Sequence, residues 1–272
     1  MSKKIVAIGG GENGRIKNDG KRSPYETGPM DREIIKLTDK KYPNFLFIGH
    51  SQPLEIQEGY FHVMQNIYDK MYGCNCKCLK SSELIDKEKV EKLINWADII
   101  YEGGGNTLDM IKLWKNTGFD IVLKKAWEDG KVMCGVSAGA NCWFKECSSD
   151  SLKILYGNDQ PMISMECLGF VKGFFVPHCD ETGRYETAKE LLKESDLIGI
   201  LCSNCSAIEI IDDQFTIITS DASYHNLQEG YVLKIYWNKI SKAYIEQKLK
   251  YCEQLRPLNK LLSKHDVLNL KI

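Results

Sequence analysis

The 272-residue chain carries 36 lysine and arginine residues against 37 aspartate and glutamate residues, a formal net charge of -1. With 43% hydrophobic and 27% charged residues, its composition is that of an ordinary globular protein. A net charge this close to zero excludes the large positive surface that nucleic acids and anionic membranes attract. We therefore expect neither as a partner.

Cysteine number and apolar run length bear on the cellular location. Eleven cysteines are present, yet a chain of this size buries a sufficient core without disulfides. The N-terminal apolar run, residues 5–8, ends in three glycines, whereas a secretory signal needs about 7–15 apolar residues. No apolar run approaches the ~18 residues of a membrane span. We expect a cytoplasmic protein with reduced thiols.

Short apolar runs alternate with longer amphipathic runs in the first half of the chain. The short runs predict β-strands at residues 4–8, 44–49, 74–79, 97–101 and 132–136. The longer runs predict helices at residues 31–40, 57–72, 87–96, 107–114 and 121–129. This alternation implies crossover connections, so we expect an α/β fold: a three-layer, doubly wound, mostly parallel sheet with helices on both faces.

The second half changes in pattern. It predicts strands at residues 170–177, 198–202, 207–211, 215–219 and 231–237, and a helix at 186–195. From residue 240 onward apolar and charged residues alternate at helical spacing, so residues 235–272 are expected to form a helical C-terminal extension. No Pro-, Gly- or Ser-rich linker divides the chain, and we expect one domain, residues 1–272.

A Gly-x-Ser-x-Gly motif, residues 135–139, directly follows the predicted strand at 132–136. Its small residues allow a strained strand-to-helix turn that lifts the hydroxyl of Ser137 clear of the sheet. The N–H of Ala138 would then point at a developing oxyanion. The motif predicts a nucleophile elbow, although any tight turn capped by a serine has the same pattern.

Two further stretches lie at predicted strand ends, where parallel sheets bind ligands. Gly103-Gly104-Gly105 follows the strand at 97–101 and leaves backbone N–H groups unobstructed, which suits a second oxyanion donor, a phosphate cradle or a plain turn. His178 follows the strand at 170–177, where a neutral imidazole could accept a serine proton and return it to a leaving amine.

Together these motifs resemble a known family. Residues 101–107 (Tyr-Glu-Gly-Gly-Gly-Asn-Thr), residues 135–141 (Gly-Val-Ser-Ala-Gly-Ala-Asn) and Pro177-His178 are similar to the signature of the peptidase E and cyanophycinase family of serine peptidases. The resemblance covers residues 4–235 and implies a class I glutamine amidotransferase-like fold. It implies Ser137 as nucleophile, His178 as base, and oxyanion donors from Ala138 and the glycine loop, namely Gly104 and Gly105.

The resemblance also implies an acid that completes a catalytic triad. The position that matches peptidase E is Asp150, although its spacing from the serine is slightly shorter than in the family. Cyanophycinase-like members place a glutamate a little further on, where the next candidate here is Glu166. Asp180 and Glu181 lie too close to His178 in sequence to be preferred. We expect Asp150 to accept from the second ring nitrogen of the histidine.

Known substrates of the family carry an aspartyl residue before the scissile bond, as an Asp-X dipeptide or a β-aspartyl branch. Such a side chain needs a cationic partner, and the chain has five arginines. Arg184, just after His178, is the expected clamp, and Asn106 is a second expected substrate-binding residue. The alternatives are a hydrolase of a non-aspartyl small substrate, and a binding protein of this fold without catalytic activity.

Glycine and cysteine patterns elsewhere suggest cofactor sites that we do not favour. Residues 9–14 fit Gly-x-Gly-x-x-Gly, but no helix opens at the last glycine, as a dinucleotide site requires. We interpret this segment as a loop that lines the peptidase cleft. Three cysteines in the strand at 74–79 and the Cys202-x-x-Cys205 pair could ligate zinc, but buried packing is the better interpretation. Cys134 and Cys142 flank the elbow serine without occupying its position. We expect no metal and no cofactor.

Overall fold

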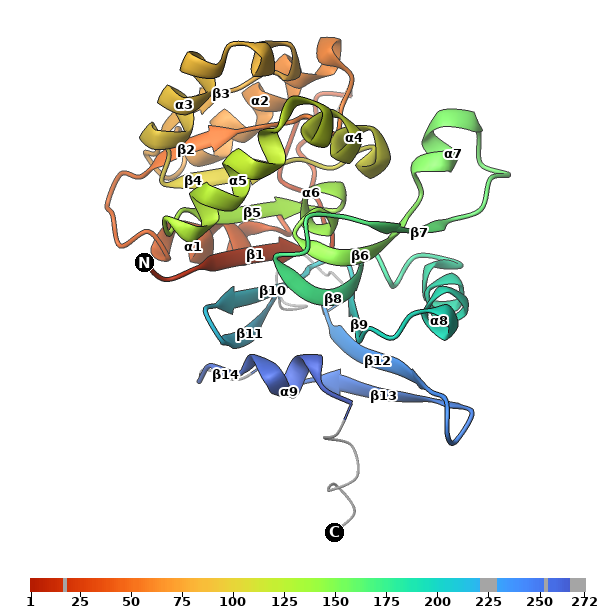
Figure 1. Ribbon diagram of the computed structural model, residues 1–272. Helices are drawn as coiled ribbons and strands as arrows, with labels where there is room; N and C mark the ends of the chain where they lie inside the picture. The colour runs from red at the N-terminus through yellow and green to blue at the C-terminus, as the bar shows by residue number, and fades with distance from the viewer. Residues whose placement is uncertain (17–18, 221–228, 252–253, 265–272) are drawn as a thin grey trace.

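The strands of this protein form two sheets (Figure 1). The computed structural model describes residues 1–16, 19–220, 229–251 and 254–264. The larger sheet has eight strands in the order β14-β11-β10-β1-β5-β4-β2-β3. Its parallel strands are β1 (Lys4–Ile8), β5 (Val132–Val136), β4 (Ile99–Glu102), β2 (Asn44–Phe47) and β3 (Asn75–Cys78). Antiparallel strands extend it beyond β1: β10 (Ser206–Ile211), β11 (Gln214–Thr219) and β14 (Arg256–Pro257).

The second sheet has six strands in the order β13-β12-β9-β8-β6-β7. Parallel pairing joins β6 (Phe144–Ser149), β8 (Val171–Val176) and β9 (Gly199–Cys202). Antiparallel strands flank them: β7 (Ile163–Glu166), β12 (Val232–Asn238) and β13 (Ala243–Leu249). The chain therefore passes from the second sheet back to the first through the short loop between β9 and β10.

Alternation along the parallel strands explains why helices cover both faces of the larger sheet. In β1, Ile5 and Ala7 pack into one apolar cluster and Val6 and Ile8 into another, because successive side chains of a strand point to opposite faces. Figure 1 shows one face covered by α3 (Lys87–Trp96), α4 (Thr107–Thr117) and α5 (Phe119–Glu128), and the other by α1 (Gly28–Lys36) and α2 (Leu54–Tyr68). The short helices at strand ends are the 3-10 turn Ser81–Ile85, α6 (Ala138–Asn141) and α7 (Ser151–Tyr156).

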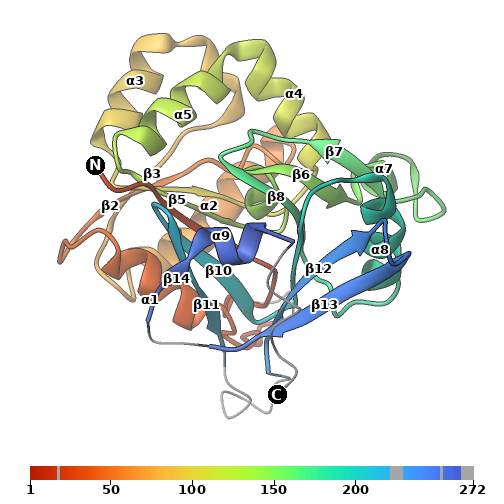
Figure 2. The same ribbon diagram turned by 60° about the horizontal axis from the view of Figure 1, so that its bottom comes forward.

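A third apolar cluster holds α8 (Arg184–Glu194) against the second sheet, where Ala188 and Leu192 pack on strands β8, β9 and β12. Helix α9 (Leu258–Leu262) lies between the two sheets (Figure 2). On the second sheet, the buried Lys234 of β12 donates to the carbonyl of Lys260 at 2.5 Å. On the first, the amide of Leu258 donates to the carbonyl of Asp213, beside β11, at 2.7 Å.

The expected α/β class, similar to class I glutamine amidotransferases, is confirmed, and the expected single sheet is divided in two. The expected helical extension over residues 235–272 is wrong for Ala243–Leu249, which pairs with β12 along seven residues. Residues 252–253 and 265–272 of that segment lie outside the described part of the chain. Among the described helices, none combines the length and the apolar character that crossing a bilayer requires.

Candidate active site

Ser137 occupies a strained turn between β5 and α6. Its φ of 57° and ψ of -113° are unfavourable for a residue with a side chain. A Cβ added at Gly135 or Gly139 would lie 2.5 Å or 2.1 Å from the carbonyl oxygen of Glu102, the last residue of β4. Both glycines of the motif are therefore required by the close approach of the elbow to the neighbouring strand. The predicted nucleophile elbow is confirmed as a backbone feature.

A buried carboxyl group holds the glycine loop beside the elbow. Glu102 is fully buried and accepts the N–H groups of His50 and Ser51, each at 3.1 Å. Burial raises the pKa of this carboxyl to about 8, although the two N–H donors act in the opposite direction. The same short loop contacts the glycines directly, since Gln52 donates to the carbonyl of Gly104 at 2.7 Å. The loop at 50–52 thus fixes the position of the glycine loop.

The predicted oxyanion donors differ in whether their backbone N–H groups are already engaged. The N–H of Gly104 donates to the hydroxyl of Tyr60 at 3.2 Å, so it already has an acceptor. Within the described residues no hydrogen bond engages the N–H of Gly105 or of Ala138. Gly104 nevertheless lies against the nucleophile, since a Cβ added there would be 3.4 Å from that of Ser137. The glycine loop therefore lies beside Ser137. Of the three predicted residues, Gly104 has an engaged N–H group, whereas those of Gly105 and Ala138 have no acceptor among the described residues.

His178 comes from the second sheet, directly after β8. Its φ of 52° is left-handed, and its ring packs on the backbone of Gly10, where an added Cβ would lie 2.4 Å from ring atoms. The ring nitrogen Nδ1 lies 2.8 Å from Oδ1 of Asn204, in the loop between β9 and β10. The glycines at 9 and 10 are thus explained by contact with the histidine and its loop, and not by a dinucleotide.

Asn204 determines which ring nitrogen of His178 carries the proton. Its amide nitrogen lies 3.4 Å from a carboxylate oxygen of Asp180 and 3.4 Å from one of Glu181, which can only accept. Its carbonyl oxygen therefore faces the histidine and accepts from Nδ1–H. In the neutral imidazole this arrangement places the acceptor lone pair on Nε2, as a general base requires.

A chain of charged groups extends from His178 to Asp150. Oε1 of Glu181 lies 3.3 Å from Nδ1 of His178, and Oε2 lies 3.4 Å from Nε of Arg184. The contact with the histidine, together with the guanidinium, lowers the pKa of the Glu181 carboxyl to about 2. Nη2 of Arg184 in turn binds Asp150 at 2.7 Å. An ionised carboxylate therefore lies beside the histidine, and it belongs to Glu181.

Several predicted roles need correction. Asp150 binds Arg184, while the place beside the ring nitrogen of His178 is taken by Asn204 and Glu181. The other acid considered, Glu166, is exposed and pairs with Glu146 across β6 and β7. Proximity in sequence was a poor reason to reject Glu181, because the turn after β8 brings it back onto the ring.

The two predicted substrate-binding residues are engaged elsewhere. Asn106 caps α4: its Oδ1 accepts the N–H of Asp109 at 3.1 Å, and its side chain is buried. Arg184 is held by two carboxylates, those of Asp150 and Glu181. Neither is among the residues that line the cavity described next.

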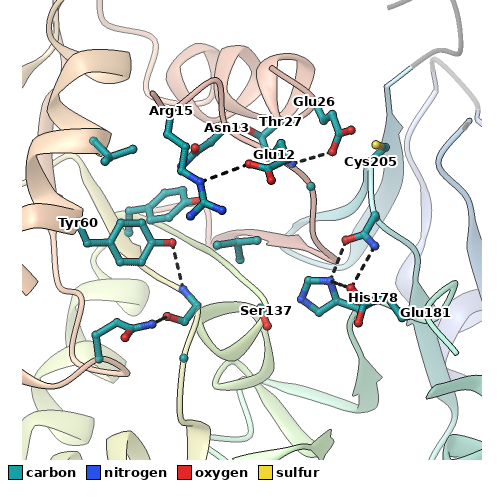
Figure 3. Close-up of a pocket in the computed structure, with 18 of the residues that line it drawn as sticks. Glu12, Asn13, Arg15, Glu26, Thr27, Tyr60, Ser137, His178, Glu181 and Cys205 are labelled. Atoms are coloured by element: carbon teal, nitrogen blue, oxygen red, sulfur yellow. Dashed lines mark hydrogen bonds and ion pairs between the residues drawn. The ribbon is translucent and has the colours of Figure 1, made fainter. Parts of the chain in front are cut away.

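Ser137 and His178 line one cavity of about 990 Å³ (Figure 3). Gly104, Gly105 and Asn204 also line this cavity. The remaining lining combines polar side chains with apolar ones, most of them from the N-terminal segment and α2: Glu12, Asn13, Arg15, Glu26, Thr27, Gln52, Glu55 and Tyr60, together with Ile56, Val63, Tyr101 and Val136. The prediction that the glycine-rich segment at 9–14 lines the cleft is confirmed by Gly11 and its neighbours.

The model of peptidase family S51 matches residues 19–218 of this chain. The chain belongs to peptidase family S51. It is 30% identical over 230 residues to an uncharacterised peptidase, YgaJ, of Bacillus subtilis (strain 168), over 81% of this chain and 89% of that protein. The S51 relationship identifies this protein as a serine peptidase.

Two solved structures share the fold of this S51 peptidase. A peptidase from an acI-B1 actinobacterium superposes with a TM-score of 0.67 at 20% identity, over 94% of this chain and 97% of that chain. A peptidase E candidate from Listeria monocytogenes EGD-e superposes with a TM-score of 0.57 at 17% identity, over 81% of this chain and 100% of that chain.

The cysteines of this S51 peptidase are placed for packing. Cys134 and Cys142 are fully buried, and burial raises the pKa of each thiol well above its usual value. In the described residues every cysteine is a free thiol. No cluster of three or more His, Cys, Asp or Glu residues in the same part of the chain is arranged to hold a metal ion.

Sequence reasoning missed three residues of this site: Asn204, Tyr60 and Arg15. Asn204 follows the predicted strand at 198–202 by two residues, so its place at a strand end was the available signal. Tyr60 and Arg15 lie in a helix and in an N-terminal loop, and no motif marks either one.

Proposed function

We propose that this S51 peptidase is an exopeptidase that hydrolyses short peptides through an acyl-enzyme on Ser137, with His178 as the general base. One observation carries the proposal: Asn204 accepts from Nδ1 of His178 at 2.8 Å, which leaves Nε2 free on the cavity that Ser137 also lines. Glu181, ionised beside the same ring, stabilises the imidazolium that forms when the base accepts a proton.

The proposed reaction has two halves that use the same groups. The hydroxyl oxygen of Ser137 attacks the scissile carbonyl while its proton passes to Nε2 of His178. The N–H groups of Gly105 and Ala138 stabilise the oxyanion, and the imidazolium then protonates the leaving amine. Water attacks the acyl-enzyme in the second half, with His178 as base again, and the released acid leaves Ser137 free.

The size and polarity of the cavity support a short peptide as substrate. A volume of about 990 Å³ is at the upper end of the ~300–1,000 Å³ range of small-molecule pockets. Aspartyl peptides, either Asp-X or β-Asp-X, are the substrates we propose, because the family resemblance favours them. An aspartyl side chain requires a cation on the cavity wall, and Arg184, the expected one, does not line it.

Hydrolysis of a panel of dipeptides tests the proposal. The parent and Ser137→Ala are assayed on Asp-X, β-Asp-X and neutral dipeptides, and both are treated with a fluorophosphonate. We expect labelling at Ser137 and release of free amino acid by the parent only. If the parent cleaves neutral dipeptides and not aspartyl ones, the proposed substrate class is wrong and the proposed mechanism still holds. Peptide cleavage by Ser137→Ala within tenfold of the parent would overturn the mechanism.

A further inference from the structure

An N-terminal hairpin forms the wall of the cavity that faces the nucleophile. Residues 13 and 25, and residues 16 and 22, pair as antiparallel bridges. The backbone of Arg15 is fixed in this hairpin, because its carbonyl accepts the N–H of Ser23 at 2.8 Å. The base of the hairpin is closed by Glu26, which donates its N–H to the carbonyl of Glu12 at 2.7 Å and accepts the N–H of Glu12 at 2.7 Å.

Alternation along this hairpin sends Asn13 and Arg15 toward the cavity. Both line it, as residues two apart on an extended strand share a face. Ile16, the next residue, is 63% exposed, and its bridge partner Arg22 is exposed as well. The hairpin therefore carries one arginine on its cavity face and another on its solvent face.

Glu12 holds one edge of the Arg15 guanidinium, and the other edge faces the cavity. Its Nε lies 3.4 Å from a carboxylate oxygen of Glu12. Figure 3 shows the group pointing from the hairpin into the cavity, toward the side on which Ser137 and Tyr60 lie. The two terminal nitrogens of a guanidinium form the bidentate contact with a carboxylate. A contact through Nε fixes the orientation of the group and leaves that fork for a ligand.

The carboxylates around the cavity restrict where a ligand anion can bind. Among the described lining residues, Arg15 is the one lysine or arginine, against six acidic residues: Glu12, Glu26, Glu55, Asp180, Glu181 and Glu229. A ligand carboxylate is repelled along most of this wall and attracted at Arg15. The free amino group of the same peptide is suited to the acidic remainder. The cavity thus matches a zwitterionic ligand in one orientation.

We propose that Arg15 is the specificity-determining residue of this site and that its terminal nitrogens bind the side-chain carboxylate of an aspartyl peptide substrate. This inference rests on the proposed peptidase function. Arg184, which the sequence suggested for this task, instead positions Glu181 and Asp150 behind His178.

Two charge-removing variants test the assignment: Arg15→Gln and Arg22→Gln. Arg22→Gln is the matched control, because it removes the same charge from the solvent face of the same hairpin. Each is assayed on Asp-Leu and on Asn-Leu, which differ in one charge at nearly equal size. Arg15→Gln is expected to lower kcat/KM for Asp-Leu about thirtyfold, as for a lost charge-assisted hydrogen bond, and for Asn-Leu less than threefold. Arg22→Gln is expected to change neither.

Binding measurements on the Ser137→Ala background separate this inference from the proposed function. Asp-Leu and Asn-Leu are titrated calorimetrically into Ser137→Ala, with and without Arg15→Gln. Binding of Asp-Leu that depends on Arg15, without hydrolysis by the parent, keeps the inference and overturns the peptidase assignment for this substrate. Hydrolysis of Asp-Leu that is indifferent to Arg15→Gln, or lost equally for both peptides, overturns the inference alone. If Ser137→Ala binds neither peptide and the parent cleaves neither, the inference that Arg15 binds a substrate carboxylate is wrong.

Discussion

Ser137 and His178 donate their backbone N–H groups to consecutive carbonyls at the end of β1, those of Ile8 and Gly9, each at 3.1 Å. Ser137 and His178 follow strands of different sheets, yet both are anchored to one short segment. Because the anchors are backbone bonds, substitution of either side chain leaves them in place. Loss of activity in such variants then reports on chemistry and not on a displaced loop.

Strain at the elbow predicts a variant that is more stable and inactive. Ser137 has a φ of 57°, and residues in such regions cost about 1–3 kcal/mol. Ser137→Gly relieves that cost, less about 1 kcal/mol for the flexibility of glycine in the unfolded chain. We expect its free energy of unfolding to exceed that of Ser137→Ala by about 1 kcal/mol. Chemical denaturation of the two variants measures the difference, and a less stable Ser137→Gly would show that the elbow is not strained.

The carboxylates of Glu181 and Asp150 are predicted to contribute differently to kcat. Glu181→Gln removes the charge beside Nδ1 of His178 and should lower kcat about tenfold or more with little change in KM. Asp150→Asn acts only through Arg184 and should lower kcat less than threefold. Steady-state kinetics of both variants on one substrate decide the point. A larger loss in Asp150→Asn would return the role of triad acid to that residue.

Asn204 and Glu181 share one ring nitrogen, so their substitutions should not be additive. Asn204→Ala removes the nearer acceptor of Nδ1–H, and Glu181 at 3.3 Å can still accept. We expect about a tenfold loss of kcat for Asn204→Ala, and a loss for Asn204→Ala/Glu181→Gln beyond the product of the two single effects. Strictly multiplicative losses in the double-mutant cycle would mean that the two groups act independently.

Glu102 predicts how stability depends on pH. Its pKa in the folded protein is raised to about 8, above the ~4.3 expected of an unfolded chain. The folded state therefore retains a proton that the unfolded state releases, and this contribution to stability falls as the pH rises from about 4.3 to about 8. Glu102→Gln cannot titrate, so its free energy of unfolding should fall less steeply over this interval. Denaturation at a series of pH values compares the slopes, and parallel curves would contradict the raised pKa.

Packing of the elbow on β4 predicts that one glycine tolerates no side chain. Gly139→Ala would place a Cβ 2.1 Å from the carbonyl oxygen of Glu102, and we expect a loss of about 3 kcal/mol or more. Gly59→Ala is the control, because Gly59 lies in α2 with no atom within 4 Å of an added Cβ. It should gain about 0.5–1 kcal/mol. Thermal unfolding measures both, and an unchanged midpoint in Gly139→Ala would contradict the packing.

Sequence reasoning placed Ser137 and His178 at strand ends because each stands in a local pattern, an apolar strand followed by a turn. The partners of His178 follow no such pattern. Asn204 is 26 residues away and reaches the ring only because the chain crosses between sheets at that point. Asp150 was preferred because its position matches that of the acid in peptidase E, although its spacing from the serine is slightly shorter. A match in sequence position does not indicate that the guanidinium of Arg184 binds that carboxylate.

The C-terminal segment was misjudged for a related reason. Ala243–Leu249 carries charged residues at positions compatible with either a helix or a half-exposed strand, and the short pattern does not separate the two. Its conformation is decided by β12, which offers a free edge to pair with. The bounds of α3, by contrast, were predicted to the residue, because its apolar face is regular and Asp86 caps its first turn.

Helix α9 reaches both sheets, through Asp213 beside β11 and through Lys234 of β12. Ser137 follows a strand of one of these sheets, and His178 follows a strand of the other. Helix α9 therefore links the sheet that carries Ser137 to the sheet that carries His178, in addition to the backbone bonds that both residues make to the end of β1. Deletion of α9 is expected to lower activity without removing any of the described residues that line the cavity.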